Sequence, residues 1–247
     1  MRLKPVGVLG GMGPQATVLL MQKVIAAVPA KDDGDHIPLL VDQNTQVPSR
    51  LRHLLEAGSE NPGPVLAGMA LRLQSAGAEA LAMPCNTAHY YAAEIGNACD
   101  LPLLDMVVLS VEYAASLAPD NGCVGILASP AVRKVGLFDQ AMKAAGLRAL
   151  YSDDQTALVA AIRAIKSLGP NEAARATLRS ASAELLGRGA LVQMIACTEF
   201  SLVADEVAPG VSAFDTLDRL VLAIVEFSRG DPDSRQQNTQ YHRQTLA

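Results

Sequence analysis

The chain has 247 residues, of which half are hydrophobic, 18% are charged and none is tryptophan. This composition is typical of a compact α/β protein and argues against disorder outside the C-terminal tail. The formal net charge is −5 and lysine and arginine form no cluster, which argues against a nucleic-acid-binding surface and favours a small-molecule partner. No segment reads as a signal peptide or membrane span, so we expect a cytoplasmic protein without a membrane partner.

The four cysteines, at positions 85, 99, 123 and 197, form no C-x-x-C pair. They are too sparse for a secreted disulfide framework, so we expect free thiols in a reducing compartment. The four histidines are scattered without the spacing of metal ligands. The sequence therefore predicts no metal site.

The chain alternates short apolar segments with amphipathic ones. The first unit is a strand in PVGVLGG, a glycine turn and a helix beginning near Pro14. Similar pairs of a strand and a helix follow in chain order at 37–58, 65–86, 123–146 and 171–200. This alternation predicts mostly parallel sheets covered by helices on both faces.

Two halves of the chain resemble one another. VGVLGG at 6–11 is similar to VGILAS at 124–129, and LAMPCNT at 81–87 is similar to MIACTE at 194–199. Gly125 follows Gly7 by 118 positions and Cys197 follows Cys85 by 112, so the repeat is about 115 residues long.

The repeat predicts two similar α/β lobes with a pseudo-symmetric arrangement. We place the N-terminal lobe at 1–113 and the C-terminal lobe at 114–209, with 210–228 crossing back to the first lobe and a polar tail at 229–247. Open α/β sheets bind ligands beyond the carboxyl ends of their strands. Two facing lobes would therefore bring Cys85 and Cys197 to one cleft, where the active site is expected.

A glycine turn suggests a rival interpretation. Gly11, Gly13 and Ala16 have the G-x-G-x-x-A spacing of a dinucleotide-binding turn. The acidic residue expected about 20 positions later has as candidates only three aspartates, in a loop before the second strand, and no G-K-[ST] sequence follows. The same turn presents backbone N–H groups at a helix start, which suit a carboxylate as well as a phosphate.

Several motifs together resemble the aspartate/glutamate racemase family, the cofactor-independent amino-acid racemases that use two cysteines, and in particular its aspartate racemase type. The motifs are GVLGGMGPQAT (7–17), NTQVPSR (44–50), MPCNTAHYY (83–91), GILASP (125–130), the Ile-Lys pair at 165–166 and ACTEF (196–200). The resemblance implies a two-lobed fold, a homodimer, no cofactor and an amino-acid substrate. It makes the chain an isomerase.

The resemblance also implies roles for individual residues. Cys85 and Cys197 would be the catalytic acid and base. The substrate-binding residues would be Gly11, Met12, Gln46, Arg50, Asn86, Thr87, Ser129, Lys166, Thr198 and Glu199. Among them, Gln46, Arg50 and Lys166 occupy positions that bind the substrate carboxylate in aspartate-type members. Ser49, Ser129 and Phe138 depart from the residues common in the family, which leaves the identity of the substrate open.

Two thiols can racemise an amino acid without a cofactor. A thiolate removes the α-proton from one face and a thiol delivers a proton to the other, so one cysteine must be ionised while the other is protonated. The leading prediction is interconversion of L- and D-aspartate, with glutamate or a broader set also open. The alternatives are a two-thiol enzyme such as a maleate isomerase or hydantoin racemase, and a non-catalytic carboxylate-binding protein.

Overall fold

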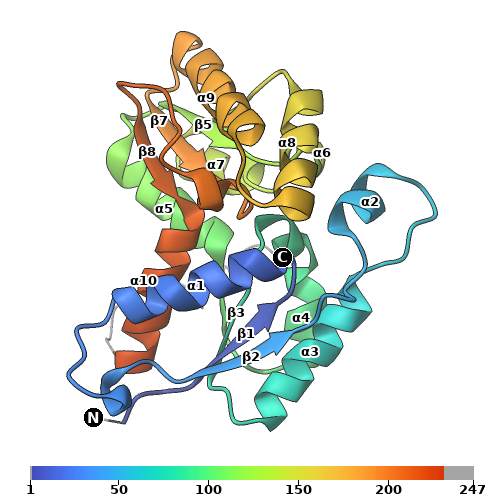
Figure 1. The fold of residues 1–247 in the computed structure, drawn as a ribbon, viewed down its shortest axis with the longest axis vertical. Coiled ribbons are helices and arrows are strands. Elements are labelled where there is room, and N and C mark those ends of the chain that lie inside the picture. The colour runs from blue at the N-terminus through green and yellow to red at the C-terminus, as the bar shows by residue number, and fades with distance from the viewer. Residues whose placement is uncertain (1, 231–247) are drawn as a thin grey trace.

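The protein is described from a computed structural model that covers residues 2–230. Its strands form two separate four-stranded parallel sheets, ordered β2-β1-β3-β4 and β6-β5-β7-β8. Helices flank both sheets, and the two lobes lie one above the other (Figure 1). The predicted fold class is confirmed. Residues 231–247 of the predicted tail lie outside the described residues, and the predicted lobe boundaries stay a prediction.

The first sheet contains β1 (Val6–Gly10), β2 (Leu39–Gln43), β3 (Ala80–Ala82) and β4 (Leu103–Leu104). Its connecting helices are α1 (Pro14–Ala26), η1 (Asp33–Asp35), α2 (Arg50–Leu55), α3 (Gly63–Ser75), η2 (Asn86–Tyr91) and α4 (Ala92–Ala98). Helix α5 (Met106–Leu117) then leads into the second lobe. Residues of α1 pack with Val6 and Val8 on one face of the sheet, and residues of α3 and α4 pack with Leu9 and Leu81 on the other.

The second sheet contains β5 (Cys123–Leu127), β6 (Arg148–Tyr151), β7 (Val192–Ile195) and β8 (Ser212–Asp215). Its helices are α6 (Pro130–Val135), α7 (Asp139–Ala144), α8 (Gln155–Leu168), α9 (Glu172–Gly187) and η3 (Phe200–Val203). The strand-and-helix pair predicted at 123–146 contains two helices instead of one, because Gly136 ends α6 in a left-handed conformation with φ +61. Glycine adopts that conformation without steric cost, and α7 begins three residues later.

The predicted repeat is visible in the packing as well as in the strand order. A side chain at Gly7 would meet Leu73, Ala78 and Leu81 at 3.0–3.2 Å. A side chain at Gly125 would meet the residues 112 positions further along, namely Leu185, Ala190 and Gln193, at 2.8–3.2 Å. Both central strands therefore carry glycine where a neighbouring helix and strand leave no room for a side chain.

The C-terminal segment joins the two lobes. Strand β8 pairs with β7 in the second sheet, whereas α10 (Thr216–Arg229) packs against α1 and strands of the first sheet. Figure 1 shows α10 running from the upper lobe down along the lower one. Leu217, Leu220 and Ile224 of α10 are fully buried in the same core cluster as Val6 and Val8.

Asp215 lies at this crossing and caps α10. Its Oδ1 accepts hydrogen bonds from the Leu217 amide (2.9 Å) and the Ser201 hydroxyl (2.9 Å), whereas the buried Oδ2 has no partner within residues 2–230. Burial raises the pKa of Asp215 from 3.8 to about 6. The folded protein consequently holds the Asp215 proton more tightly than the unfolded chain does between about pH 4 and pH 6.

We expect Asp215→Asn to remove a pH-dependent loss of stability. Because the folded-state pKa is the higher one, the stability that the protonated carboxyl contributes is present below pH 4 and lost as the pH rises to about 6. The difference corresponds to about 3 kcal/mol, and asparagine keeps the capping acceptor. Urea unfolding of both proteins from pH 4 to 7 measures it; equal pH dependence in the two would contradict the assignment.

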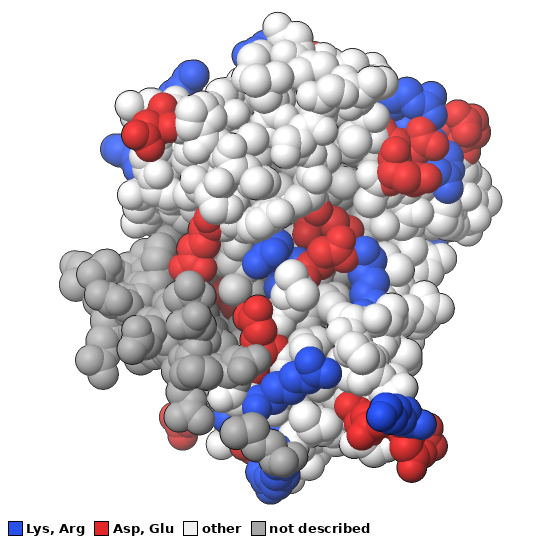
Figure 2. Space-filling model, turned by 90° about the vertical axis from the view of Figure 1, so that its left-hand side faces the viewer, with Lys and Arg blue, Asp and Glu red and all other residues white. Residues whose placement is uncertain are grey.

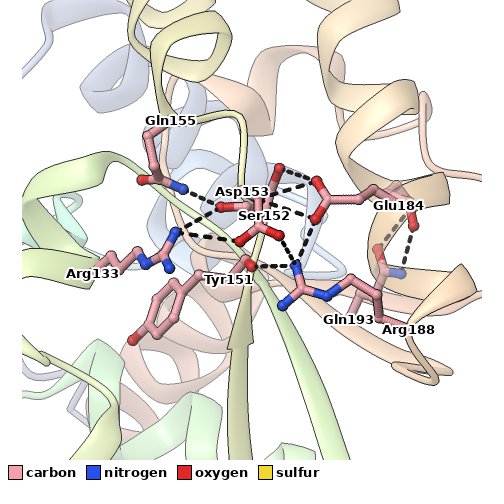
Figure 3. Close-up of polar contacts among 9 residues, drawn as sticks. Arg133, Tyr151, Ser152, Asp153, Gln155, Glu184, Arg188 and Gln193 are labelled. Carbon is pink, nitrogen blue, oxygen red and sulfur yellow. Dashed lines mark hydrogen bonds and ion pairs between the residues drawn. The ribbon is translucent and has the colours of Figure 1, made fainter.

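A polar network closes the second lobe at the carboxyl end of β6 (Figure 3). Glu184 on α9 accepts hydrogen bonds from the Ser152 hydroxyl, the Asp153 amide and the Arg188 guanidinium. Partial burial opposes ionisation of Glu184, but these donors outweigh the effect of burial and lower the pKa of Glu184.

Within residues 2–230 we find no helix both long and apolar enough to span a membrane.

Candidate active site

The two predicted catalytic cysteines occupy equivalent places in the two lobes. Cys85 follows β3 and Cys197 follows β7, the strand at the same position in each sheet. Each cysteine carbonyl accepts a hydrogen bond from the amide three residues later, from Ala88 (3.1 Å) and from Phe200 (2.8 Å). Both residues are 7% exposed and neither forms a disulfide.

One small pocket between the lobes contains both cysteines. Its cavity volume is about 30 Å³, enough for a water molecule but too small for a typical ligand. The pocket is lined by Met12, Ser49, Arg50, Leu51, Cys85, Thr87, Ser129, Ile162, Lys166, Cys197 and Glu199. We call it the inner pocket.

A larger pocket, here the outer pocket, adjoins the inner one, and its volume of about 300 Å³ is within the usual range for ligand sites. The two share Ser49, Arg50, Lys166 and Glu199. The outer pocket also has Gly11, Gly13, Pro14, Gln15, Ala16, Thr45, Val47 and Leu202 in its lining. The glycine turn before α1 therefore faces a ligand-sized space, and the four shared residues separate that space from the cysteines.

Arg50 is held by backbone carbonyl groups. Its guanidinium donates to the carbonyls of Val47 (3.2 Å), Pro48 (3.0 Å) and Met12 (3.3 Å), while the buried Nε has no partner in the described part of the chain. Arg50 begins α2, and α2 packs against α6 of the other lobe. The segment that carries Arg50 thus bridges the cleft.

Lys166, Glu199 and Cys197 form a contiguous polar chain. The Cys197 thiol donates to Glu199 Oε2 at 3.1 Å, and Glu199 Oε1 lies 3.2 Å from Lys166 Nζ, an ion-pair distance without hydrogen-bond alignment. Burial, and after it the Glu199 carboxylate, raise the pKa of Cys197 well above its ordinary value, and Lys166 opposes that effect. Figure 2 shows basic and acidic side chains close together at the level where the lobes meet.

Behind the cysteines, hydrogen bonds connect the two lobes. The Asn86 amide nitrogen donates to the Thr216 hydroxyl (3.0 Å), which donates to the Ile195 carbonyl (3.0 Å). The hydroxyls of Thr87 and Ser129 lie 3.2 Å apart across the cleft. These contacts fix the strand ends that carry the thiols.

His89 has a structural position. Its Nε2 accepts the Met106 amide (3.1 Å), so Nδ1 carries the proton and donates to the Cys85 carbonyl (3.0 Å). The imidazole thus ties the turn after Cys85 to the start of α5 and contacts the cysteine backbone rather than its thiol.

Of the twelve predicted site residues, eight line the inner pocket and Gly11 lines the outer one. Gln46, Asn86 and Thr198 line neither pocket. Gln46 is exposed and Thr198 is buried. The inner pocket is also lined by Ser49, Leu51 and Ile162, which were not among the predicted site residues. Ile162 lies four residues before Lys166 on α8, and that helical spacing places both on one face.

Some of the buried polar atoms without a hydrogen-bond partner among the described residues belong to predicted site residues, and others lie elsewhere in the fold. Arg50 Nε, Asn86 Oδ1 and Glu199 Oε1 are buried and lack a hydrogen-bond partner among the described residues. Buried polar atoms are normally paired, so Arg50 Nε and Glu199 Oε1, which belong to residues lining both pockets, are available to a ligand or to water there. Within residues 2–230, no cluster of three or more His, Cys, Asp or Glu side chains has a geometry that could hold a metal ion.

The fold and the site define a two-lobed α/β protein with a paired-thiol cleft, and comparison with known proteins gives its family. Residues 9–224 match the model of the Asp/Glu/Hydantoin racemase family. The chain therefore belongs to the Asp/Glu/Hydantoin racemase family. It is an enzyme, an isomerase of the racemase type, as the sequence predicted.

The chain is also similar to individual proteins, and the solved structures among them share its fold. The chain is 25% identical over 216 residues to the broad specificity amino-acid racemase RacX of Bacillus subtilis, covering 85% of this chain and 92% of that relative. The structure of Picrophilus torridus aspartate racemase superposes with a TM-score of 0.82 at 24% identity, over 92% and 94% of the two chains. An aspartate racemase homologue from Pyrococcus horikoshii OT3 superposes with a TM-score of 0.71 at 19% identity, over 92% and 100%.

Proposed function

We propose that the protein is a pyridoxal-phosphate-independent amino-acid racemase that interconverts L- and D-aspartate with Cys85 and Cys197 as a two-base pair. The observation that carries the proposal is the inner pocket, where both thiols meet Arg50 and Lys166. The family membership supports the reaction type.

In the proposed reaction the thiolate of one cysteine takes the α-proton and becomes a thiol. The thiol of the other cysteine gives its proton to the opposite face of Cα and becomes a thiolate, so the product is the other enantiomer and the two thiols have exchanged their states. The α-carboxylate gains negative charge as the proton leaves, and backbone N–H groups near Gly11 and Asn86 are the proposed donors to it. Thr87 and Thr198 are proposed to support the thiols.

Arg50 and Lys166 are proposed to hold the side-chain carboxylate of the substrate, with Met12 and Ser129 completing the binding site. A guanidinium binds a carboxylate in a defined orientation as well as by charge. Because Arg50 is bonded to three carbonyls and Lys166 is paired with Glu199, a substrate carboxylate must displace some of these contacts. Its entry also requires the inner pocket to widen.

A broader substrate range is the second candidate. The outer pocket, with a volume of about 300 Å³, offers space for side chains longer than that of aspartate. The name of the Bacillus subtilis relative, a broad specificity amino-acid racemase, supports the same direction. Glutamate and larger polar amino acids are therefore the first substrates to compare with aspartate.

Proton NMR in D₂O with the purified protein and no added pyridoxal phosphate tests the function. We expect the α-proton signal of L-aspartate to disappear while its optical rotation falls to zero. Parallel tubes contain L-glutamate, L-lysine, maleate and a 5-substituted hydantoin. Exchange confined to lysine or glutamate would replace aspartate as the substrate. Turnover of only maleate or the hydantoin, or binding of aspartate without exchange of its α-proton, would contradict the proposal of an amino-acid racemase.

We also propose that the enzyme works as a homodimer in the cytoplasm, because the aspartate/glutamate racemases that its motifs resemble are usually dimers. No nucleic acid or membrane partner is proposed. Light scattering coupled to gel filtration measures the assembly, and a mass of one chain across the working concentration range would contradict the dimer.

A further inference from the structure

The two cysteines have unlike surroundings although the lobes repeat one another. The residue two positions after Cys85 is Thr87, and the residue two positions after Cys197 is Glu199. Thr87 contacts Ser129 across the cleft, whereas Glu199 accepts the Cys197 thiol proton in a 3.1 Å hydrogen bond. The repeat is therefore broken by one negative charge, placed at only one of the two thiols.

A carboxylate at this distance has a definite preference between the two forms of a thiol. An ionised carboxylate can only accept a hydrogen bond, so it stabilises Cys197 as the thiol and repels a thiolate at the same place. The Glu199 side chain is 10% exposed, and water therefore screens this interaction little. Gly13 of the first lobe lies near the same carboxylate. A Cβ added at Gly13 would lie 3.7 Å from Glu199 Oε1.

The other charged groups of the inner pocket are Arg50 from α2 and Lys166 from α8, and the other thiol there is Cys85 from the loop after β3. Lys166 is paired with Glu199 and so weakens the effect of Glu199 on Cys197. The pocket thus contains two cations and one carboxylate, and the carboxylate directly contacts Cys197.

We propose that Glu199 is a positioning residue that keeps Cys197 in its thiol form and so reserves the resting thiolate for Cys85. Lys166 sets the strength of this preference by partly neutralising Glu199. The catalytic meaning of this inference rests on the proposed racemase function, because the inference states which cysteine starts as the acid and which as the base. It predicts that the enzyme at rest is prepared for the enantiomer whose α-proton faces Cys85.

Thiol alkylation without substrate tests this assignment. The wild type, Glu199→Gln and Lys166→Met are treated with iodoacetamide from pH 6 to 9, and mass spectrometry of the digests gives the rate at each cysteine. Cys85 and Cys197 are equally exposed, at 7%, so a rate difference reports mainly thiolate content. The partly exposed Cys123 is the internal reference for reagent and fold.

We expect Cys85 to react first in the wild type. Glutamine keeps a hydrogen-bond acceptor and loses the charge, so Glu199→Gln should speed alkylation of Cys197 by at least about threefold at pH 7.5 and move its pH profile to lower pH. Lys166→Met should move that profile the opposite way. A wild type in which Cys197 reacts faster than Cys85, or an unchanged Cys197 profile in Glu199→Gln, would overturn the proposal.

The same data separate this inference from the proposed function. Alkylation needs no turnover, so a protein that fails to racemise any amino acid still gives the order of thiol reactivity. Conversely, the protein could racemise an amino acid while its Cys197 alkylation has the same pH profile in the wild type and in Glu199→Gln. That result would refute only the positioning role of Glu199.

Discussion

Replacing either Cys85 or Cys197 with serine will abolish racemisation of the substrate. Serine keeps nearly the same volume in the inner pocket, but its hydroxyl is a far weaker acid and cannot exchange roles with the remaining thiol. General acid–base groups contribute about 10²–10⁴-fold to a rate, and both are used in each turnover, so a kcat loss of at least that size is expected. Polarimetry of aspartate measures it.

The exchange of the α-proton with D₂O sharpens this test. A variant with one remaining cysteine can still remove and return a proton on its own face, so each variant should exchange one enantiomer without inverting it, and the two variants should select opposite enantiomers. Cys123→Ser is the control, since Cys123 starts β5 and lines neither pocket. Full turnover in either single-cysteine variant would end the two-base mechanism.

Replacing Gly11 with alanine will destabilise the protein and remove activity. Gly11 has φ +89, and a Cβ there would lie 2.4 Å from the carbonyl carbon and oxygen of Asn44. The cost of a left-handed alanine and the cost of its collision with the backbone add together. The free energy of unfolding is therefore expected to fall by about 3 kcal/mol or more. Chemical denaturation measures the stability, and the racemase assay measures the distortion of the outer pocket that Gly11 lines.

Gly77→Ala is the matched control for this substitution. Gly77 has nearly the same backbone conformation, φ +95, and no atom lies within 4 Å of the Cβ that alanine would add. Only the conformational cost of about 1–2 kcal/mol should remain, with activity retained below the melting temperature. Equal losses in the two variants would show that the contact between Gly11 and Asn44 has no energetic importance.

The sequence predicted the fold class because the elements in the core carry strong signals. The strand over Val6–Gly10 is fully buried and runs directly into glycines, so the sequence predicts both its position and its end. Short or partly exposed elements have weaker sequence patterns. β4 has two residues and β6 is exposed or half-buried throughout, so neither shows the pattern of a buried strand, and only neighbouring strands define them.

Within the site, motif positions predicted the cysteines, Arg50, Lys166 and Glu199 as neighbours, and all of them line the inner pocket. Contacts made by tertiary packing could not be read in the same way. Asn86 follows Cys85 directly, yet its side chain turns to Thr216, 130 positions away. Leu51 reaches the inner pocket because α2 spans the cleft and packs on the second lobe, which no local spacing encodes.

Helix α10 limits when the N-terminal lobe can fold during synthesis of the chain. The N-terminal lobe lacks one side of its core until Leu217, Leu220 and Ile224 are in place, and the ribosome makes these residues only after the strands of the second sheet. Domains that are contiguous in sequence can fold during synthesis, beginning at the N-terminus. Here the first-made half must wait, with Val6 and Val8 incompletely covered, until translation has passed through the second half.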